Sequence, residues 1–388
     1  MLVPKLRFNE FKDEWKKIKL NKIATINPQN EILPNKFIYI DLESVEKGVL
    51  IYKNIINKEN APSRAQRTVK LNDILFQTVR PYQQNNYFIN NIDNIPYVAS
   101  TGYALLRTNE DSYFLYTLMY KEEFLNNVLN MCTGTSFPAI NSNDLGTIEI
   151  NLPAKNEQEK IGKLLKLLDK KIELQKQKIE ALKIYKIGLF NKIYKEEMKT
   201  IKEEEIKKYA YLQGGYAFKS ELFSKKGIPI IRIANINESI VDLKDIVFYD
   251  KEISIDSKFE INTGDILIAM SGATTGKIGI YKETMKSYLN QRVGKIVLKR
   301  KDIIYSYLYF LFELSSYNMQ LNTKLVAGAQ PNISPSDIET LKFKVPSTEM
   351  QEHIANMAMN INKKLEIEGN KLQELNKIKK GLLQKMFI

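Results

Sequence analysis

Arginine, glutamine and asparagine side chains gather in one short segment, residues 80–86 (Arg-Pro-Tyr-Gln-Gln-Asn-Asn). These side chains hydrogen-bond base edges in the major groove of DNA, and three basic residues just upstream are placed to reach phosphates. The same residue types also solvate ordinary turns, so a single residue carries little weight. The predicted DNA contacts in this half of the chain are Arg64, Arg67, Lys70, Arg80, Tyr82, Gln83, Gln84, Asn85 and Ser136.

A second polar set lies in the other half of the chain, mainly in residues 271–277 and 290–292. One more loop is matched between the halves, residues 136–138 (Ser-Phe-Pro) in the first and 330–332 (Gln-Pro-Asn) in the second. Because the set occurs twice in a basic chain, it favours DNA over the mere solvation of turns. The predicted contacts in this half are Arg232, Ser271, Thr274, Thr275, Lys277, Asn290, Gln291, Arg292, Gln330 and Asn332.

Catalytic chemistry is poorly represented. The chain has one cysteine, Cys132, and one histidine, His353, which argues against zinc sites and Cys–His or Ser–His machinery. Residues 272–277 resemble a phosphate-binding loop, but the spacing is one residue short and Ile278 stands where Ser or Thr would hold magnesium. We therefore predict that the chain is not an enzyme and holds no catalytic group, metal or cofactor of its own.

The charge balance points to an anionic partner. Lys and Arg total 58 against 45 Asp and Glu, which gives a net charge of +13 and a pI near 9.3. Such an excess favours nucleic acid or an anionic membrane surface, although a Lys-rich proteome would produce it too. No stretch reaches the ~18 apolar residues that span a bilayer, and the N-terminus lacks an apolar signal region. A cytoplasmic location is expected.

The sequence contains an internal repeat: two similar halves, with an offset of 193 residues between their best-matched parts. Pro153 recurs as Pro346 and Gln158 as Gln351. Weaker matches extend into the preceding regions, where Gly102 is aligned with Gly294. A duplicated unit of this kind predicts near two-fold internal symmetry, which is also what a protein needs to read two separated DNA sites.

Each copy ends in a long helix with apolar residues at strict 4-3 spacing, typical of a coiled-coil seam. Lys186 and Lys379 interrupt the seam at matched places, where polar residues fix register and partner number. Because a globular region lies between the two helices, we expect them to pair antiparallel as a rigid spacer. The predicted seam residues are Ile161, Leu165, Leu168, Ile172, Ile179, Leu182, Leu189, Ile354, Ile361, Leu365, Leu372, Leu375 and Leu382.

Short β-branched runs broken by Asn, Pro and Gly precede each helix, and the same order of strands and helices recurs. The predicted fold class is α+β, with two homologous mixed α/β domains and two long helices. The expected boundaries are 1–152 for the first domain, 153–198 for the first helix, 199–345 for the second domain and 346–388 for the second helix.

The chain resembles the specificity (S) subunit of type I restriction–modification systems. The resemblance rests on residues 152–161 and their copy 345–354, on the closing residues 380–387 and on the opening residues 4–8. One departure is Met350, where the family often has Glu before Gln. The resemblance implies a non-catalytic subunit of a phage-defence complex, in which each globular domain is a target-recognition domain that reads half of a bipartite, asymmetric DNA site.

The resemblance also implies partners. The antiparallel helices would set the spacing between half-sites and dock two modification (methyltransferase) subunits, which bring S-adenosylmethionine. Two restriction (motor/nuclease) subunits, which use ATP and magnesium, would complete the complex. An alternative is a non-enzymatic coiled-coil scaffold with two domains that bind proteins or glycans. A fragment of a fused restriction–methylation enzyme would need catalytic motifs that we do not find.

Overall fold

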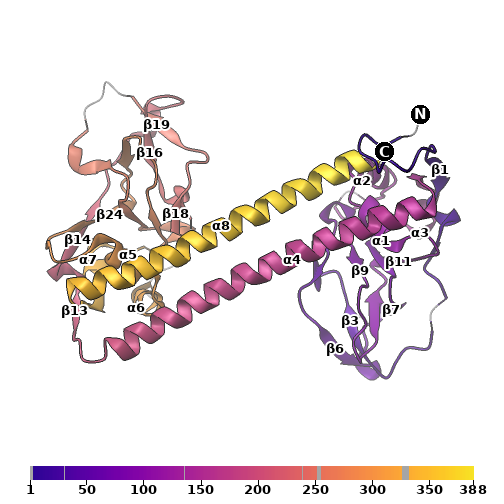
Figure 1. Ribbon diagram of the computed structural model, residues 1–388, viewed down its shortest axis with the longest axis horizontal. Coiled ribbons are helices and arrows are strands. Elements are labelled where there is room, and N and C mark those ends of the chain that lie inside the picture. Colours follow the sequence, from indigo (N-terminus) through magenta and orange to yellow (C-terminus); the bar gives the residue numbers. More distant parts are fainter. Residues whose placement is uncertain (1–2, 30, 135, 238, 251–254, 326–331) are drawn as a thin grey trace. The chain divides into compact units, whose positions relative to one another are not determined.

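The computed structural model describes the chain apart from residues 1–2, 30, 135, 238, 251–254 and 326–331 (Figure 1). The chain divides into two compact units. Unit 1 consists of Met1–Gln177 and Gly369–Ile388, and unit 2 of Lys178–Glu368. Each unit therefore holds one globular region and part of both long helices, so the C-terminal residues complete the unit that the N-terminal residues begin.

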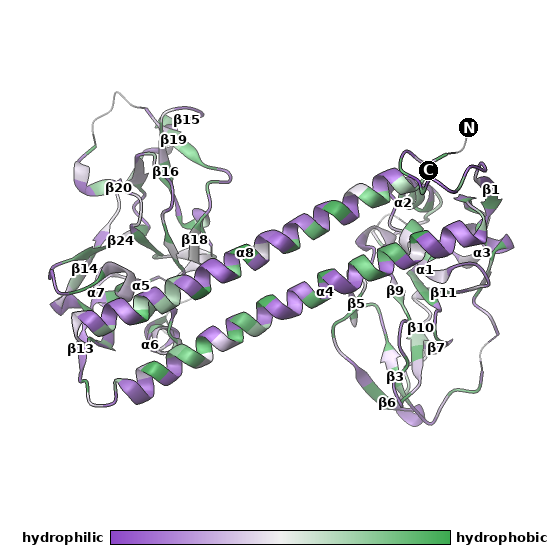
Figure 2. Ribbon diagram, viewed as in Figure 1, coloured by the Kyte–Doolittle hydropathy of each residue, from purple (hydrophilic) through white to green (hydrophobic). Residues whose placement is uncertain are grey.

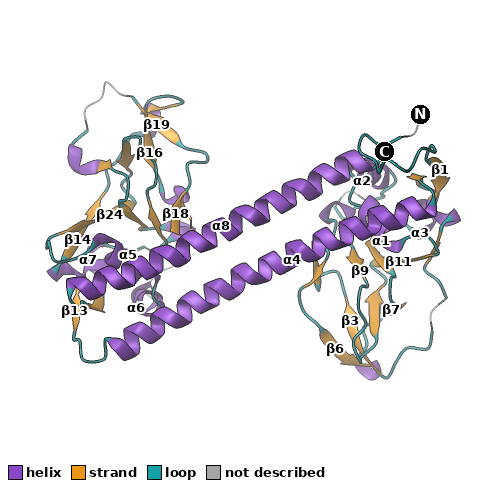
Figure 3. Cartoon of the chain, viewed as in Figure 1, coloured by secondary structure: helices purple, strands orange, loops and turns teal. Residues whose placement is uncertain are grey.

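The two long helices are α4 (Lys155–Lys192) and α8 (Thr348–Met386) (Figure 3). Each begins two residues after a proline, Pro153 or Pro346, because the residue before a proline is disfavoured in a helix and the chain cannot turn helical earlier. With 38 residues, α4 is roughly 57 Å long at about 1.5 Å per residue. It ends in a short π-helical turn, η4 (Ile193–Glu197).

In unit 1, two four-stranded sheets carry the globular region, with strand orders β6-β3-β10-β7 and β2-β11-β8-β9. Only β3 and β10 pair in parallel; the other pairs in these sheets are antiparallel. The strands are β1 (Lys16–Lys19), β2 (Ala24–Ile26), β3 (Lys36–Ile40), β4 (Val45–Glu46), β5 (Val49–Leu50), β6 (Asn54–Asn57), β7 (Ala65–Thr68), β8 (Ile74–Gln77), β9 (Tyr87–Phe88), β10 (Tyr97–Ser100), β11 (Tyr103–Thr108) and β12 (Glu149–Leu152). The short helices are α1 (Ser112–Leu118), α2 (Glu122–Asn130) and α3 (Ser142–Thr147).

Unit 2 repeats this plan with longer sheets, in the orders β15-β19-β16-β23-β20 and β14-β24-β21-β22-β18-β17. The parallel pair recurs as β16 with β23. The strands are β13 (Glu203–Glu205), β14 (Ala210–Gly214), β15 (Phe223–Ser224), β16 (Ile228–Ile231), β17 (Ile236–Asn237), β18 (Ser239–Val241), β19 (Val247–Tyr249), β20 (Glu260–Ile261), β21 (Ile266–Ala269), β22 (Ile278–Ile280), β23 (Ser287–Leu289), β24 (Val293–Leu298) and β25 (Lys342–Lys344). The helices are α5 (Tyr305–Glu313), α6 (Ser315–Leu325) and α7 (Pro335–Glu339).

Strand alternation explains the layers. In β8, Leu75 packs between the two sheets of unit 1, while Ile74 and Phe76 face the cluster that includes the helices. In unit 2, β21 does the same, with Leu267 between the sheets and Ile266 in the helix-side cluster. Because both faces of these strands are buried, they read as continuous apolar runs. On the long helices α4 and α8, by contrast, green hydrophobic and purple hydrophilic residues are mixed along the whole length (Figure 2).

The repeated glutamine tethers each long helix to its domain. Gln158 and Gln351 are each 1% exposed. Nε2 of Gln158 donates to the carbonyl of Pro153 (2.9 Å), and its Oε1 accepts from the backbone N–H of Asp111 just before α1 (3.2 Å). Gln351 makes the matching bonds to Pro346 O and from Ile304 N–H, both 2.9 Å. Both buried amides are therefore satisfied in the same way.

The alignment of Gly102 with Gly294 is wrong by two residues. Gly294 is the second residue of β24, so its counterpart is Ala104, the second residue of β11. Hydrogen bonds give the same register: Thr78 N–H donates to Gly102 O (3.0 Å), and Met270 N–H donates to Arg292 O (2.9 Å). Gly102 thus corresponds to Arg292, because the loops before these strands differ in length.

The segments of α4 and α8 pair antiparallel inside each unit. In unit 2, Lys178 lies 3.0 Å from Glu368, and Lys186 Nζ lies 2.6 Å from Asn362 Oδ1, so residue numbers rise on α4 as they fall on α8. In unit 1, Lys379 Nζ lies 2.6 Å from Asp169 Oδ1. The two lysines that interrupt the seam therefore make equivalent contacts, one in each unit.

None of the helices in the described part of the chain is both long and apolar enough to cross a membrane.

Candidate DNA interface

In unit 1, the predicted segment 80–86 forms a tight loop around a buried amide. The turn η3 (Pro81–Gln83) is flanked by Arg80 and Gln84, both in left-handed conformation with φ of 53°. The amide of Gln77, 1% exposed, donates to Gln83 Oε1 (2.8 Å) and accepts from Asn85 N–H (2.9 Å). Gln83 and Asn85 thus shape the loop, and Tyr82 is 51% exposed at its surface.

The structure brings Arg80 together with the loop that contains Ser136. A β-bridge joins Val79 to Ala139, and Arg80 N–H donates to Pro138 O at 2.7 Å. The Arg80 guanidinium carbon lies 4.4 Å from the ring centroid of Phe137, which is 61% exposed. Phe137 was not among the predicted contacts; its signal in the sequence was an apolar residue in an otherwise polar loop.

The upstream basic residues differ in availability. Arg64 is exposed, and its carbonyl accepts from Thr101 N–H at 2.9 Å. Arg67 is half-buried on β7, where burial lowers the pKa of its guanidinium, and its Nε has no hydrogen-bond partner among the described residues. Lys70 pairs with Glu31 at 2.6 Å, so part of its charge is already neutralised. These three side chains supply a basic strip in which Lys70 contributes least.

In unit 2, hydroxyl groups of the predicted segment 271–277 are used within the protein. Thr274 Oγ1 donates to Ile233 O (3.1 Å) and Thr275 Oγ1 to Gly272 O (2.6 Å) around the turn η9 (Gly272–Thr274). Ser271 is 3% exposed, and Lys277 is half-buried. The segment is thus organised around a turn.

Ser271 meets two other predicted residues of unit 2, Asn332 and Arg292. A β-bridge joins Ser271 to Asn332, and Arg292 Nη1 donates to Ser271 Oγ at 3.3 Å. Gln291 and Arg292 are exposed, and Asn290 bridges to Tyr216. Arg232 donates instead to the carbonyl of Asp245 (2.7 Å). Gln330 lies outside the described residues.

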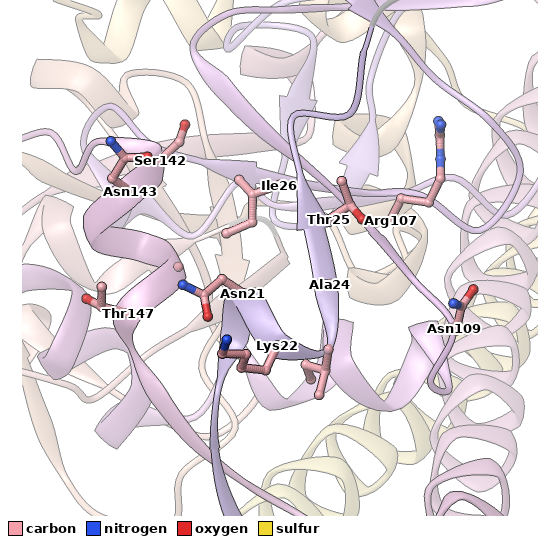
Figure 4. Close-up of a pocket in the computed structure, with 12 residues that line it drawn as sticks. Asn21, Lys22, Ala24, Thr25, Ile26, Arg107, Asn109, Ser142, Asn143 and Thr147 are labelled. Carbon is pink, nitrogen blue, oxygen red and sulfur yellow. The ribbon is translucent and has the colours of Figure 1, made fainter.

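A cavity of about 750 Å³ lies elsewhere in unit 1, between β2, α3 and the end of β11. Figure 4 shows Asn21 beside the helix that carries Ser142 and Thr147. Arg107 lines it too, but its guanidinium makes two hydrogen bonds to Asp73 (2.8 and 2.6 Å), which raise the pKa of Arg107. The cavity contains no predicted contact. Within the described ranges, no group of three or more His, Cys, Asp or Glu side chains is arranged to hold a metal ion.

The predicted seam residues lie on the covered sides of α4 and α8. Ile161, Leu165, Ile172 and Ile354 are buried, and the other nine are half-buried. By contrast, several apolar residues elsewhere on the same helices are exposed, among them Leu174 (55%) and Ile367 (45%).

Two related α/β regions with basic, polar loops, joined through a helix pair, are the architecture of a protein that reads DNA sequence. The profile of the family described as "Type I restriction modification DNA specificity domain" matches residues 12–184 and again residues 189–377. The two matches span most of the chain, which therefore belongs to this family.

Relatives agree with this membership. The type I restriction enzyme MjaVIII specificity subunit of Methanocaldococcus jannaschii is 26% identical over 309 residues, 74% of this chain and 72% of the relative. The crystal structure of the type I S subunit from M. genitalium superposes with a TM-score of 0.66 at 17% identity, covering 100% of this chain and 99% of that one. A structure from work on assembly and conformational transition of the type I R-M system gives 0.57 at 18%, covering 96% and 97%. The two structural likenesses show a shared fold.

Several predictions are thereby confirmed. The chain is a non-catalytic specificity subunit of a type I restriction–modification system that recognises a DNA target. Its fold is two homologous mixed α/β regions with two long helices in contact. Specificity subunits bind no cofactor, and S-adenosylmethionine lies in their methyltransferase partners. As a member of this family, the chain takes part in a type I restriction–modification system that acts on DNA.

Proposed function

We propose that each unit reads one half of a bipartite, asymmetric DNA site. The observation that carries this proposal is that the two units share one scaffold but present different side chains at the same loops: Arg80 and Phe137 in unit 1, Ser271, Arg292 and Asn332 in unit 2. Because loops vary while a scaffold is retained, two different base sequences are expected for the two half-sites. The basic side chains of Arg64, Arg67 and Lys277 attract phosphates and position the duplex.

The antiparallel helices act as the spacer between the readers. Two weak readers joined rigidly gain from effective concentration only when the half-sites lie at the right separation. Support comes from the covered seam and from the seam lysines, whose matched contacts fix the register inside each unit. The boundaries 1–152, 153–198, 199–345 and 346–388 describe this alternation of readers and spacer.

The spacer role is tested by inserting one heptad into each helix, after Gln177 in α4 and after Glu368 in α8. These points lie beside the contact between Lys178 and Glu368, so the two insertions face each other. Seven residues complete about two helical turns, so the seam continues on the same face. The permitted spacer in the DNA target should lengthen while both half-site sequences stay the same. An unchanged spacer in a folded variant would show that the helices do not measure it.

The same helices are proposed to dock two methyltransferase subunits. Exposed apolar residues recur at the 193-residue offset, Leu174 (55%) with Ile367 (45%) and Tyr185 (59%) with Ile378 (52%). A repeated apolar position is what two copies of one partner require. Two restriction subunits would complete the complex, and we expect the complex in the cytoplasm because it acts on DNA.

Docking is tested by Leu174→Glu and Ile367→Glu, singly and together, with the mass of the complex as the measurement. Each single variant should lose one methyltransferase and the double variant both. Two methyltransferases retained in the double variant would place their docking surface elsewhere.

The overall function is tested by sequencing the methylome of a restriction-deficient host that expresses the chain with the methyltransferase of its own system. An asymmetric bipartite motif with methyladenine on both strands, absent without the chain, is expected. A stable complex that adds no methylation would favour the scaffold alternative.

A further inference from the structure

Arginine is scarce in this chain, and its placement is selective. Only eight of the 58 basic residues are Arg. Arg7, Arg107 and Arg300 pair with carboxylates, those of Glu157, Asp73 and Asp302. The other five are Arg64, Arg67, Arg80, Arg232 and Arg292, all of them in or beside polar loops. Lysine would serve for charge alone, so arginine in a loop indicates a need for its rigid, forked set of donors.

Two of these arginines lie at one corner of the scaffold. The corner is the place where the loop after β8 or β21 bridges to the loop before α3 or α7, through Val79–Ala139 in unit 1 and Ser271–Asn332 in unit 2. The turn before β11 or β24 joins it: Gly102 O accepts from Thr78 N–H, and Arg292 O from Met270 N–H. The corner is therefore the same structural element in both units.

Arginine and glycine exchange places between the two corners. Arg80 follows the end of β8 by three residues, and Gly272 follows the end of β21 by three. Both are left-handed, with φ of 53° and 78°. At the second position, directly before β11 or β24, unit 1 has Gly102 and unit 2 has Arg292. Each corner thus carries one arginine, supplied from opposite positions.

Arginine at position 80 is conformationally unfavourable, because this residue has a positive φ. The left-handed region is unfavourable for a residue with a Cβ, and unit 2 meets it with glycine. Unit 1 nevertheless places Arg80 there, held by the hydrogen bond from its N–H to Pro138 O (2.7 Å). Such a residue persists where surrounding structure fixes it, and these positions cluster at functional sites.

Each guanidinium is also oriented by a neighbour. Phe137 presents its ring 4.4 Å from the Arg80 guanidinium carbon, a stacked cation–π arrangement. Arg292 donates from Nη1 to Ser271 Oγ (3.3 Å), and Ser271 is itself 3% exposed and so held in place. No carboxylate in the described part of the chain pairs with either arginine, so donors of both guanidinium groups are available to a ligand.

We propose that Arg80 in unit 1 and Arg292 in unit 2 each read a guanine, by paired hydrogen bonds to O6 and N7, with Phe137 and Ser271 as their positioning residues. A forked, pre-oriented guanidinium matches the two acceptors on the major-groove edge of guanine, the commonest specific arginine contact. The inference rests on the proposed half-site reading and adds the base that each corner reads.

The test compares methylated motifs from the full complex carrying the wild-type chain, Arg80→Ala or Arg80→Lys, with Arg300→Ala as a control that removes an arginine outside the corners. One G·C pair in one half-site should become degenerate in both Arg80 variants, with a loss of discrimination of about tenfold to a hundredfold. All other positions, and the Arg300→Ala motif, should stay unchanged. Lysine should not rescue, because it lacks the fork.

The alternatives give different outcomes. If Arg80 contacts a phosphate, Arg80→Ala lowers methylation equally at all sites without changing the motif, and Arg80→Lys retains most of it; either result overturns the proposal. A wild-type chain that yields no bipartite motif would instead refute the half-site function itself.

The positioning role of Phe137 is tested with Phe137→Leu and Phe137→Tyr. Leucine should relax the same single base pair, by less than Arg80→Ala does, and tyrosine should restore it because its ring still stacks. A lower methylation level with an unchanged motif would mean that Phe137 only supports the loop. Arg292→Ala should relax one G·C pair in the other half-site; degeneracy in the same half-site as Arg80→Ala would overturn the assignment.

Discussion

Units 1 and 2 use the same strands and helices but secure them with different side chains. In unit 1, Arg7 makes two hydrogen bonds of 2.7 Å to the buried carboxylate of Glu157, which lies next to Gln158 at the start of α4. In unit 2 the matching residue is Met350, which packs on the apolar core of that unit. The repeated glutamine is unchanged, so the backbone tether is kept while the packing around it is free to vary.

The comparison of the two units separates the residues that the scaffold requires from those that can vary. Gln158 and Gln351 satisfy buried backbone groups, so their loss would leave donors and acceptors unpaired. Loop positions that make no such tether have diverged, as Arg80 and Gly272 show. A shared tether and divergent loops are what the proposed reading of two sequences by one fold requires.

The largest change expected from the comparison is a replacement of residues 15–152 by the corresponding domain of another family member. One half-site should be replaced completely and the other should stay intact, because each unit has its own core. The methylome gives both half-sites at once. The donor must keep aromatic residues at Trp15 and Phe114, since Phe387 stacks on Phe114 at 5.1 Å. A change in both half-sites would contradict independent reading.

A second test removes the ion pair found only in unit 1. Glu157→Ala should lower the free energy of unfolding of unit 1 by about 3–5 kcal/mol, because it leaves the poorly exposed Arg7 guanidinium without its partner. The single tryptophan of the chain, Trp15, lies beside Glu157 (Nε1 to Oε1, 3.4 Å), so urea unfolding followed by its fluorescence reports this unit.

The matched control copies unit 2, which has an apolar residue, Met350, at the position of Glu157. Arg7→Met combined with Glu157→Met should recover most of the lost stability, since an apolar pair of similar volume replaces a buried ion pair at little cost. A double variant no more stable than Glu157→Ala would show that the pair contributes more than mutual charge compensation.

A third test compares the seam lysines. Lys186 contacts Glu313 and Asn362 at 2.6 Å each, and its side chain and that of Glu313 are 13% and 7% exposed. Lys186→Ala should cost about 2–3 kcal/mol, because it leaves the buried carboxylate of Glu313 without its cationic partner. Lys379→Ala should cost about 1 kcal/mol, since the Lys379–Asp169 pair is more exposed.

Hydrogen exchange measures both effects, at the amides of α5 for Lys186 and of α1 for Lys379. When the lysine is removed, Asp169 keeps a hydrogen bond of 2.8 Å from Tyr113, whereas Glu313 keeps only a longer one of 3.4 Å from Asn362, which is a second reason for the smaller cost of Lys379→Ala. Equal losses of protection in both units would contradict the assignment of the asymmetry to burial.

The smallest effect concerns the caps of α3 and α7. Ser334 Oγ donates to Asp337 (2.6 Å), and hydrogen bonds from the side chain and backbone of Ser334 lower the pKa of Asp337 below its ordinary 3.8. A lowered folded pKa stabilises the protein above pH 3.8 and ceases to do so as the pH falls through the folded value. In unit 1, α3 uses Asn141 at the corresponding cap.

Asp337→Asn should therefore destabilise unit 2 by about 1 kcal/mol at pH 7 and by less at acid pH, once the carboxylate of the wild type is protonated. The measurement is calorimetry at pH 7 and near pH 3. Trp15 fluorescence, followed in parallel, identifies the unfolding transition of unit 1, and the other transition is then assigned to unit 2. A difference that stays constant across this range would exclude ionisation of Asp337 as its cause.

Much of the architecture was predictable because the sequence patterns behind it are periodic or repeated. The 193-residue offset and the 4-3 spacing of apolar residues follow from the period of a helix and from duplication, so they predicted the two long helices and the two related domains. The individual contacts were less predictable: Gln83 and Asn85 were predicted to meet bases, but the structure uses them to close their own loop around Gln77.

The sequence by itself determined the duplicated architecture, the covered face of each helix and the absence of catalytic machinery, because these depend on residue types and local spacing. Only the tertiary structure decided that Gly102 corresponds to Arg292 and that Phe137 lies against Arg80, since strand pairing brings together residues that are far apart in the chain and sets their register. It also decided that the last residues of α8 complete unit 1, because the apolar side chains of Met386 and Phe387 are buried in the core around Trp15.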